Sequence, residues 1–123
     1  MRAVAVIVVL IGLAGCVTPS IPIPPPDPVR MTFDVTTDPN GTITAATFSY
    51  PSVENYKGGV VYVYNRSLGT GIIQAVNTDG SIGPTMPVAG TLNHQIVITI
   101  ENDEQTVSQC VLLKAGAPTS YCP

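Results

Sequence analysis

Apolar residues at every second position, in short runs separated by turn residues, dominate the chain from residue 31 to residue 114. The runs 31–36 and 94–101 alternate strictly, which places their apolar side chains on one face of a strand. Turn sequences such as Asp38-Pro39-Asn40-Gly41 separate the runs, and no run has the 3.6-residue period of an amphipathic helix. The pattern predicts an all-β sandwich of seven strands. These strands are expected at residues 31–36, 42–50, 60–65, 71–76, 81–88, 94–101 and 106–114.

Three of these runs carry a further expectation. Residues 60–65 (VVYVYN) are apolar on both faces, which favours a central strand. Residues 81–88 contain Pro84 and Pro87, which cannot donate to a ladder and favour an edge position. Residues 106–114 keep neither phase of the alternation, which indicates a β-bulge.

Characteristic turn residues recur through the second half of this pattern. They are the strand end at Asn65, Gly69-Thr70-Gly71, Asp79-Gly80-Ser81-Ile82, Val88-Ala89-Gly90, and the strand pair Ile96–Glu101 and Val107–Leu113. On these residues the chain resembles the bacterial Ig-like (fibronectin-III-like) modules of cell-surface proteins. The resemblance covers about half of the chain, which lacks the buried Trp and the inter-sheet cysteine pair of antibody-type domains. It implies a single Ig-like antiparallel β-sandwich over residues 31–123 and assigns no activity.

A short apolar segment preceded by one basic residue opens the chain. Arg2 comes before the run Ala3–Ala14, and residues 3–17 carry no charge. This run is too short to span a membrane, which takes about 18–20 apolar residues, and it fits an export signal. Its end, Leu13-Ala14-Gly15-Cys16, resembles the lipobox of bacterial lipoproteins. The resemblance implies a signal peptide over residues 1–15 and lipidation of Cys16, with an ordinary signal peptide or a retained anchor as the alternatives.

The lipobox resemblance also implies a location. The protein would be lipid-anchored in the bacterial cell envelope, because two or more acyl chains hold a protein at a membrane effectively permanently. Val17, and not Asp, would be the second mature residue. In many Gram-negative bacteria this directs a lipoprotein to the outer membrane, where this protein would face the periplasm or the outside.

A proline-rich stretch follows the proposed lipidation site. Residues 17–30 contain six prolines. Proline fixes φ and lacks an N–H, so the stretch is expected to be extended and to serve, over residues 16–30, as a semi-rigid tether of roughly 40 Å. A ligand for a proline-recognising domain is the alternative, since Pro22 and Pro25 fit the minimal motif.

Charge and cysteine count limit the partners and suggest a disulfide. Removal of residues 1–15 leaves 108 residues with four basic and eight acidic side chains, which argues against nucleic-acid binding. With Cys16 lipidated, Cys110 and Cys122 remain, and an even number in an exported protein favours a disulfide between them. The other possibility is that Cys122, one residue from the end, frays or pairs elsewhere.

Catalytic, metal-binding and cofactor-binding motifs are not expected in this chain. His94 is the one histidine, no nucleophile-elbow sequence is present, and a solvated residue at a strand end is expected there. Two acidic turn clusters, Glu101/Asp103/Glu104 and Asn77/Asp79, do not match a calcium-binding loop. We therefore expect no enzyme activity, no metal and no cofactor.

Tyr62 and Tyr64 share one face of the strand at 60–65, and exposed tyrosines favour interfaces. They are the candidate binding residues, although strand propensity alone also explains them. The expected function is that of a membrane-anchored binding or structural module with a protein partner in the envelope. The alternatives are a pilotin-like assembly factor of an envelope complex and a small periplasmic enzyme inhibitor that presents the loop Tyr50–Asn55.

Overall fold

The alternating runs form seven strands in the part of the chain that the computed structural model describes, residues 22–123. Except at 81–88, the strand ends lie within two residues of the predicted ones. Two single turns of 3-10 helix, η1 (Pro28–Arg30) and η2 (Glu54–Tyr56), complete the elements. The strands are β1 (Thr32–Thr37), β2 (Ile43–Ser49), β3 (Val60–Asn65), β4 (Thr70–Ala75), β5 (Val88–Ala89), β6 (Gln95–Asn102) and β7 (Gln105–Leu112).

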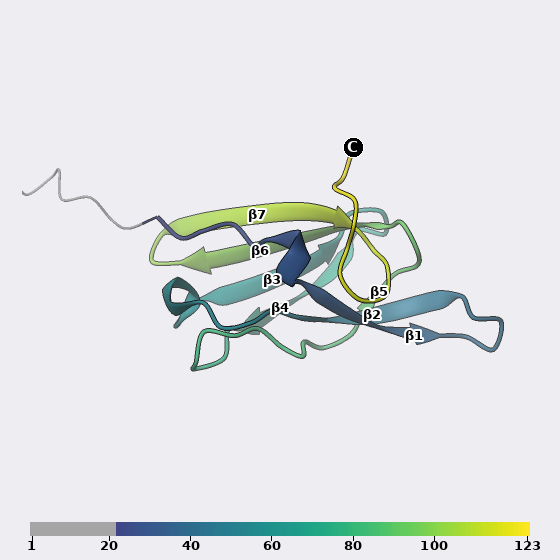
Figure 1. Ribbon diagram of the computed structural model, residues 1–123, viewed down its shortest axis with the longest axis horizontal. Helices are drawn as coiled ribbons and strands as arrows, with labels where there is room; N and C mark the ends of the chain where they lie inside the picture. Colours follow the sequence, from purple (N-terminus) through teal and green to yellow (C-terminus); the bar gives the residue numbers. More distant parts are fainter. Residues whose placement is uncertain (1–21) are drawn as a thin grey trace, which may run out of the picture.

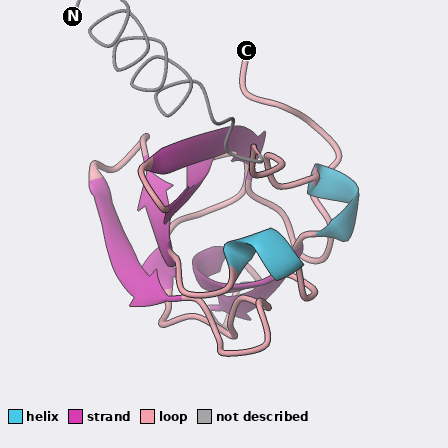
Figure 2. Cartoon of the chain, turned by 90° about the vertical axis from the view of Figure 1, so that its left-hand side faces the viewer, coloured by secondary structure: helices cyan, strands magenta, loops and turns pink. Residues whose placement is uncertain are grey.

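These strands make two antiparallel sheets, in the orders β1-β2-β5 and β4-β3-β6-β7 (Figure 1). The chain passes from one sheet to the other after β2, after β4 and after β5, as the connections of an Ig-like sandwich do. Viewed along the long axis, the strands and the two 3-10 turns surround the core (Figure 2). The predicted fold class, a single all-β sandwich of about seven strands, is confirmed. The central position of β3, between β4 and β6, is confirmed as well.

Two details differ from the sequence prediction. The segment 81–88 contributes only a bridge from Ile82 to Tyr50 and the short strand β5, because its two prolines cannot donate to a ladder. The bulge expected in 106–114 is absent from β7, which pairs with β6 without a shift. The mixed pattern there arises because Leu112 is half-buried on the face opposite to Val111. The register shift lies instead at Thr36/Thr37 in β1.

A row of aromatic rings occupies one part of the core. The ring centroids of Phe33 and Phe48 are 5.3 Å apart, those of Phe48 and Tyr50 are 6.3 Å apart, and those of Tyr50 and Tyr56 are 6.1 Å apart. Inward-facing valine and isoleucine side chains of β3 and β6 form another part of the core. Rings at such separations stabilise a fold beyond their burial, by about 0.5–1.5 kcal/mol per pair. The row therefore fixes where η2 packs against the first sheet.

The proline-rich stretch packs onto the sandwich over its described part. Ile23 is 7% exposed, belongs to the core, and donates a 2.9 Å hydrogen bond from its N–H to Oε1 of Gln105. The N–H of Asp27 donates to the hydroxyl of Tyr50 at 2.8 Å. The packed unit therefore includes Ile23, which lies N-terminal to the expected boundary between tether and domain at Met31. Proline prevented regular strand pairing, but it did not prevent the segment from burying apolar side chains.

The C-terminal tail lies along β7 as a short extra strand. Val111 and Tyr121 form an antiparallel bridge, and the N–H of Cys122 donates to the carbonyl of Cys110 at 3.1 Å. Cys110 and Cys122 therefore face each other directly, with a Cα–Cα separation of 5.4 Å, and they form the predicted disulfide. This confirms that the disulfide ties the tail to the last strand.

Candidate functional site

Tyr62 and Tyr64 lie together on the outer face of the four-stranded sheet. Tyr62 is opposite Ile73 of β4, and Tyr64 is opposite Gly71 of the same strand. Tyr64 is 42% exposed and Ile73 is 64% exposed. The structure therefore brings the two predicted tyrosines together at the β4 side of the sheet. We call Tyr62, Tyr64 and Ile73 the β4 patch.

Part of the contact made by Tyr64 is structural. A Cβ atom at Gly71 would lie 2.4 Å from the carbonyl oxygen of Val63 and 3.2 Å from Cδ2 of Tyr64, so only glycine fits there. The Tyr64 side chain thus packs closely over a glycine, which supplies no side chain of its own to the sheet. One side of the Tyr64 ring therefore packs against the sheet and the rest is exposed, and its binding role stays a prediction.

Tyr62 differs from Tyr64 in its hydrogen bonding. Its hydroxyl donates to Oε2 of Glu101 at 3.3 Å, across the β3–β6 pair. The negative charge of Glu101 raises the pKa of the Tyr62 phenol. The phenol is therefore a neutral donor whose hydrogen bond is directed to Glu101 of β6.

Sequence reasoning missed the apolar residues around β4. Ile73 comes from β4 itself, Leu68 stands in the turn before it, and Met86 donates its N–H to Oε1 of Gln74 in β4 at 3.0 Å. Leu68 is 51% exposed and Met86 is 55% exposed. These exposed apolar residues could have been suspected from the sequence, because neither β3 (VVYVYN) nor β4 (TGIIQA) contains a charged residue. Ile73, Leu68 and Met86 are thus three exposed apolar side chains in or near β4.

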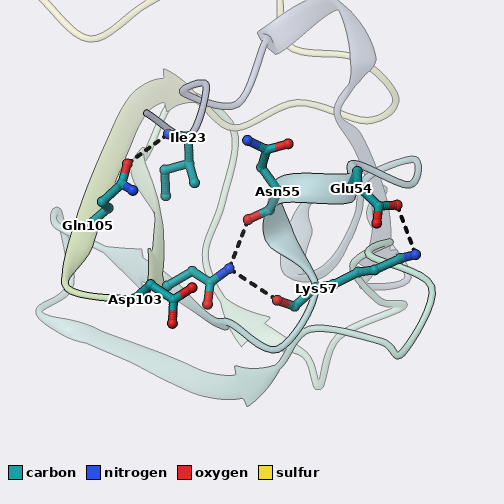
Figure 3. Close-up of a pocket in the computed structure, with 7 residues that line it drawn as sticks. Ile23, Glu54, Asn55, Lys57, Asp103 and Gln105 are labelled. Carbon is teal, nitrogen blue, oxygen red and sulfur yellow. Dashed lines mark hydrogen bonds and ion pairs between the residues drawn. The ribbon is translucent and has the colours of Figure 1, made fainter. Parts of the chain in front are cut away.

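A polar hollow of about 360 Å³ lies at the end of the sandwich where the proline-rich segment enters. Figure 3 shows Ile23 pointing into the space between Gln105 and Asn55, with Lys57 and Glu54 paired beside it. The Nζ of Lys57 lies 2.8 Å from Oε2 of Glu54. The floor is rigid because Nδ2 of Asn102 donates to the carbonyls of Asn55 and Lys57, at 2.8 and 3.0 Å.

The chemistry of this hollow is limited by its lining. Its lining side chains are those of Ile23, Glu54, Asn55, Lys57, Asn102, Asp103 and Gln105, which include no hydroxyl, thiol or imidazole. Across residues 22–123, no group of three or more His, Cys, Asp or Glu side chains is placed to hold a metal ion, and this includes both acidic turn clusters. In this hollow, the side chain of Asn102 holds the backbone of residues 55 and 57 in place.

His94 stands directly before β6, at a strand end as predicted, but its imidazole is half-buried and takes part in a hydrogen-bond network, where a solvated side chain was expected. Nδ2 of Asn65 lies 3.0 Å from Nδ1 of His94 and donates to the carbonyl of Ala89 at 2.9 Å. The N–H of Thr91 points to the same His94 nitrogen, at 3.3 Å. Since both neighbours are donors, Nδ1 is the acceptor and the ring proton is on Nε2. The imidazole thus joins β3 to the connection between β5 and β6.

Two other tyrosines and the loop between them are also structural. Tyr50 and Tyr56 are 5% and 0% exposed, and the N–H of Val53 donates to the carbonyl of Gly80 at 3.1 Å. The segment Tyr50–Asn55, which was the candidate inhibitory loop, is therefore held at both ends and in its middle. Burial raises the pKa of the Tyr56 phenol, which keeps it a neutral donor.

Cys16, the predicted lipidation site, lies outside the described residues. Over residues 22–123, no helix is both long enough and apolar enough to cross a membrane. No protein-family model matches the chain, and neither the curated proteins nor the solved structures contain a significant match. The lipobox and the Ig-like module accordingly stand as resemblances of the sequence.

Proposed function

We propose that this chain is a lipid-anchored, non-catalytic binding or structural module of the bacterial cell envelope. The observation that carries the proposal is the sequence Leu13-Ala14-Gly15-Cys16 at the end of an uncharged segment that follows Arg2. An exported, anchored protein has two cysteines left to pair, and the disulfide between Cys110 and Cys122 is consistent with an oxidising compartment. Transfer to the outer membrane follows from Val17 at the second mature position.

The packed proline-rich segment makes the proposed anchor short. Seven peptide units separate Cys16 from Ile23, a residue of the described core, and a fully extended chain of this length reaches at most about 25 Å. The end of the sandwich that holds the β6–β7 turn and the polar hollow would therefore stay near the membrane. Acidic side chains at this end, such as Asp103 and Glu104, offer no attraction to anionic lipid, so the acyl chains alone would hold the protein there.

The tyrosine pair of the β4 patch, Tyr62 and Tyr64, is the surface that we assign to binding of an envelope partner. It is apolar, uncharged and built on a rigid sheet, and its tyrosines offer large contact areas at low entropic cost. Anchoring keeps this surface within a thin layer above the membrane, which raises its effective concentration for partners on the same surface. A partner in the envelope can then be bound through a modest apolar contact.

Affinity capture from cross-linked native envelopes tests the binding role. The wild-type chain with a C-terminal tag is compared with Cys16→Ala and with two tyrosine variants, Tyr64→Ser in the β4 patch and Tyr121→Ser outside it. Tyr121 is the matched control because it is 61% exposed and remote in sequence from β4. We expect a partner that is retained by Tyr121→Ser and reduced by both Tyr64→Ser and Cys16→Ala.

The outcomes separate the alternatives. A single partner in fixed stoichiometry would indicate the pilotin-like assembly role, and an inactivated enzyme would indicate an inhibitor. If no protein is enriched with the folded wild-type chain, the binding role in the envelope is contradicted. Equal loss of the partner in the two tyrosine variants would contradict the assignment of the β4 patch.

A further inference from the structure

We infer that the exposed edge of β4 pairs with the β4 edge of a second copy of this chain, giving a two-fold dimer with a continuous eight-stranded sheet. The inference begins with the hydrogen-bond alternation of the β3–β4 ladder. The N–H of Val76 donates to the carbonyl of Gly59 at 3.0 Å, which makes Val60 and Ala75 a pair without mutual hydrogen bonds.

The same alternation fixes which backbone groups of β4 point away from β3. Residues 72 and 74 direct their N–H and C=O groups to β3, so Gly71, Ile73 and Ala75 direct theirs to the open side. Among residues 22–123, no backbone partner covers these groups. An edge of this kind is a template for another strand.

The other long edges of the sandwich are covered in part by the chain itself. At the β1 edge, Phe33 and Gly116 exchange two hydrogen bonds of 2.9 Å. At the β7 edge, the tail residues 120–122 pair with residues 110–112, and the disulfide holds them there. The β4 edge has no such cover, and it also lacks the proline, lysine or inward charge with which proteins usually protect an edge. This contrast singles out β4.

A second copy fits the edge because β4 is complementary to itself. In an antiparallel pairing centred on Ile73, the residue faces its own counterpart, and Gly71 faces Ala75 of the other copy. Each of these pairs exchanges two backbone hydrogen bonds, so every outward N–H and C=O of β4 is satisfied. Small residues face small residues, and the exposed Ile73 side chains meet on the two-fold axis, each with Tyr62 on its other side.

The distribution of charge also permits a second copy of the chain to pair at the β4 edge. The whole chain has a net charge of −3, which disfavours association of two copies, but β3 and β4 contain no charged residue. The two copies therefore meet through their neutral edges. Paired strands run in opposite directions, so the two Ile23 ends lie at opposite ends of the dimer. On the proposed function both copies are lipidated. The strands of the dimer would then run parallel to the membrane surface, and this orientation rests on the proposed function.

Cysteine cross-linking in native envelopes tests the pairing and its register in the full chain. In the proposed dimer the two Ile73 Cα atoms form a hydrogen-bonded pair about 5.5 Å apart, a separation that a disulfide can bridge. The disulfide between Cys110 and Cys122 already joins two directly opposed strand residues at 5.4 Å. We therefore expect Ile73→Cys to give a disulfide-linked dimer on mild oxidation.

Two control variants make the test specific. Ala75→Cys keeps the edge but faces Gly71 of the other copy, so it should not link to itself. Val29→Cys is more exposed than Ile73, at 81%, and reports cross-linking by random collision. A dimer from Ile73→Cys alone supports the inference. No dimer from Ile73→Cys, equal dimer from all three variants, or an adduct with a different protein would overturn it.

A second variant addresses the native contact without added cysteine. Ile73→Lys places a charge on the two-fold axis and leaves the core unchanged, since the residue is exposed. In sedimentation of the detergent-solubilised full chain, we expect a dimer for the wild type and its loss in Ile73→Lys, while Val29→Lys stays dimeric. A wild-type monomer over the whole concentration range, or a dimer in Ile73→Lys, would overturn the inference.

Discussion

The hydroxyl of Tyr56 donates a 2.6 Å hydrogen bond to the backbone carbonyl of Pro24. Tyr56 is fully buried at the end of the aromatic row, and Pro24 lies in the proline-rich segment between the proposed anchor and the first strand. This bond makes the segment part of the fold. On the proposed function, in which Cys16 is lipidated, this bond together with the burial of Ile23 would keep the sandwich close to the membrane.

Replacement of Tyr56 by Phe removes this bond and leaves the ring in place. We expect the free energy of unfolding to fall by about 1 kcal/mol, the usual net value of one such bond. The segment should also become more susceptible to limited proteolysis, because Tyr56 is one of its few polar attachments. Urea unfolding and mapping of the first cleavage sites measure both effects. Tyr64→Phe is the control, and equal effects of the two variants would contradict this role of Pro24.

The buried side chain of Asn65 is expected to matter more than any exposed polar residue. Its Nδ2 donates to the carbonyl of Ala89, and its Oδ1 accepts from the N–H of Leu68 at 3.1 Å. Asn65→Ala leaves these groups without partners and should lower the free energy of unfolding by about 2–3 kcal/mol. Asn40→Ala, in an exposed turn, should change it little. Urea unfolding of the two variants checks this, and a loss below that of Asn40→Ala would contradict it.

Loss of the disulfide should destabilise the tail and the whole fold. Closing the short loop between Cys110 and Cys122 is worth about 3 kcal/mol by loop-closure entropy. We expect the free energy of unfolding of the double variant Cys110→Ser/Cys122→Ser to fall by about this much. The amide of Leu112 should exchange faster, because its hydrogen bond to the carbonyl of Ser120 would be lost. Denaturant unfolding and hydrogen exchange test this. Reduced wild-type protein serves as the control, and unchanged exchange at Leu112 would contradict the tail pairing.

Asp79 is expected to give the fold an acid-sensitive contribution. The hydroxyl and the N–H of Ser81 donate to its carboxylate and lower its pKa below the ordinary value of 3.8. A lowered folded-state pKa means that the stabilisation is present above the unfolded-state pKa and is lost as the pH falls through the folded-state pKa.

We therefore expect Asp79→Asn to be less stable than the wild type at neutral pH, and the difference to shrink below about pH 4. Urea unfolding at several pH values measures it. In a Ser81→Ala background the pH dependence of the difference should be smaller, because one of the donors is gone. A difference that grows in acid would contradict the assignment.

The strands were predictable from the sequence because their alternation follows directly from burial on one face. The positions of β3 and β6 follow from residues such as Val61, Val63 and Ile98, each of which lies against the core. The disulfide was predictable for a different reason, since only two cysteines remain once Cys16 is set aside. Both inferences used local pattern or simple counting.

The remaining features depend on contacts between distant segments. Proline content predicted an extended chain, but not that Ile23 would reach the core or that Pro24 would meet Tyr56, 32 residues away. The segment Tyr50–Asn55 resembled an exposed loop in the sequence, but Tyr50 is buried in the fold. Tyr62 and Tyr64 were identified correctly as neighbours on one face, whereas the importance of Ile73 depends on β4 being an uncovered edge. Single-strand periodicity contains none of this information.

The lipid anchor at Cys16 is the central claim of the proposed function, and the N-terminal peptide of the protein purified from the membrane fraction tests it most directly. Mass spectrometry should find a mature chain that begins at Cys16 and carries a diacylglyceryl group with an N-acyl chain, and Cys16→Ala should leave the membrane fraction. An unmodified Cys16 thiol, a mature chain that begins elsewhere, or unchanged membrane association of Cys16→Ala would contradict it.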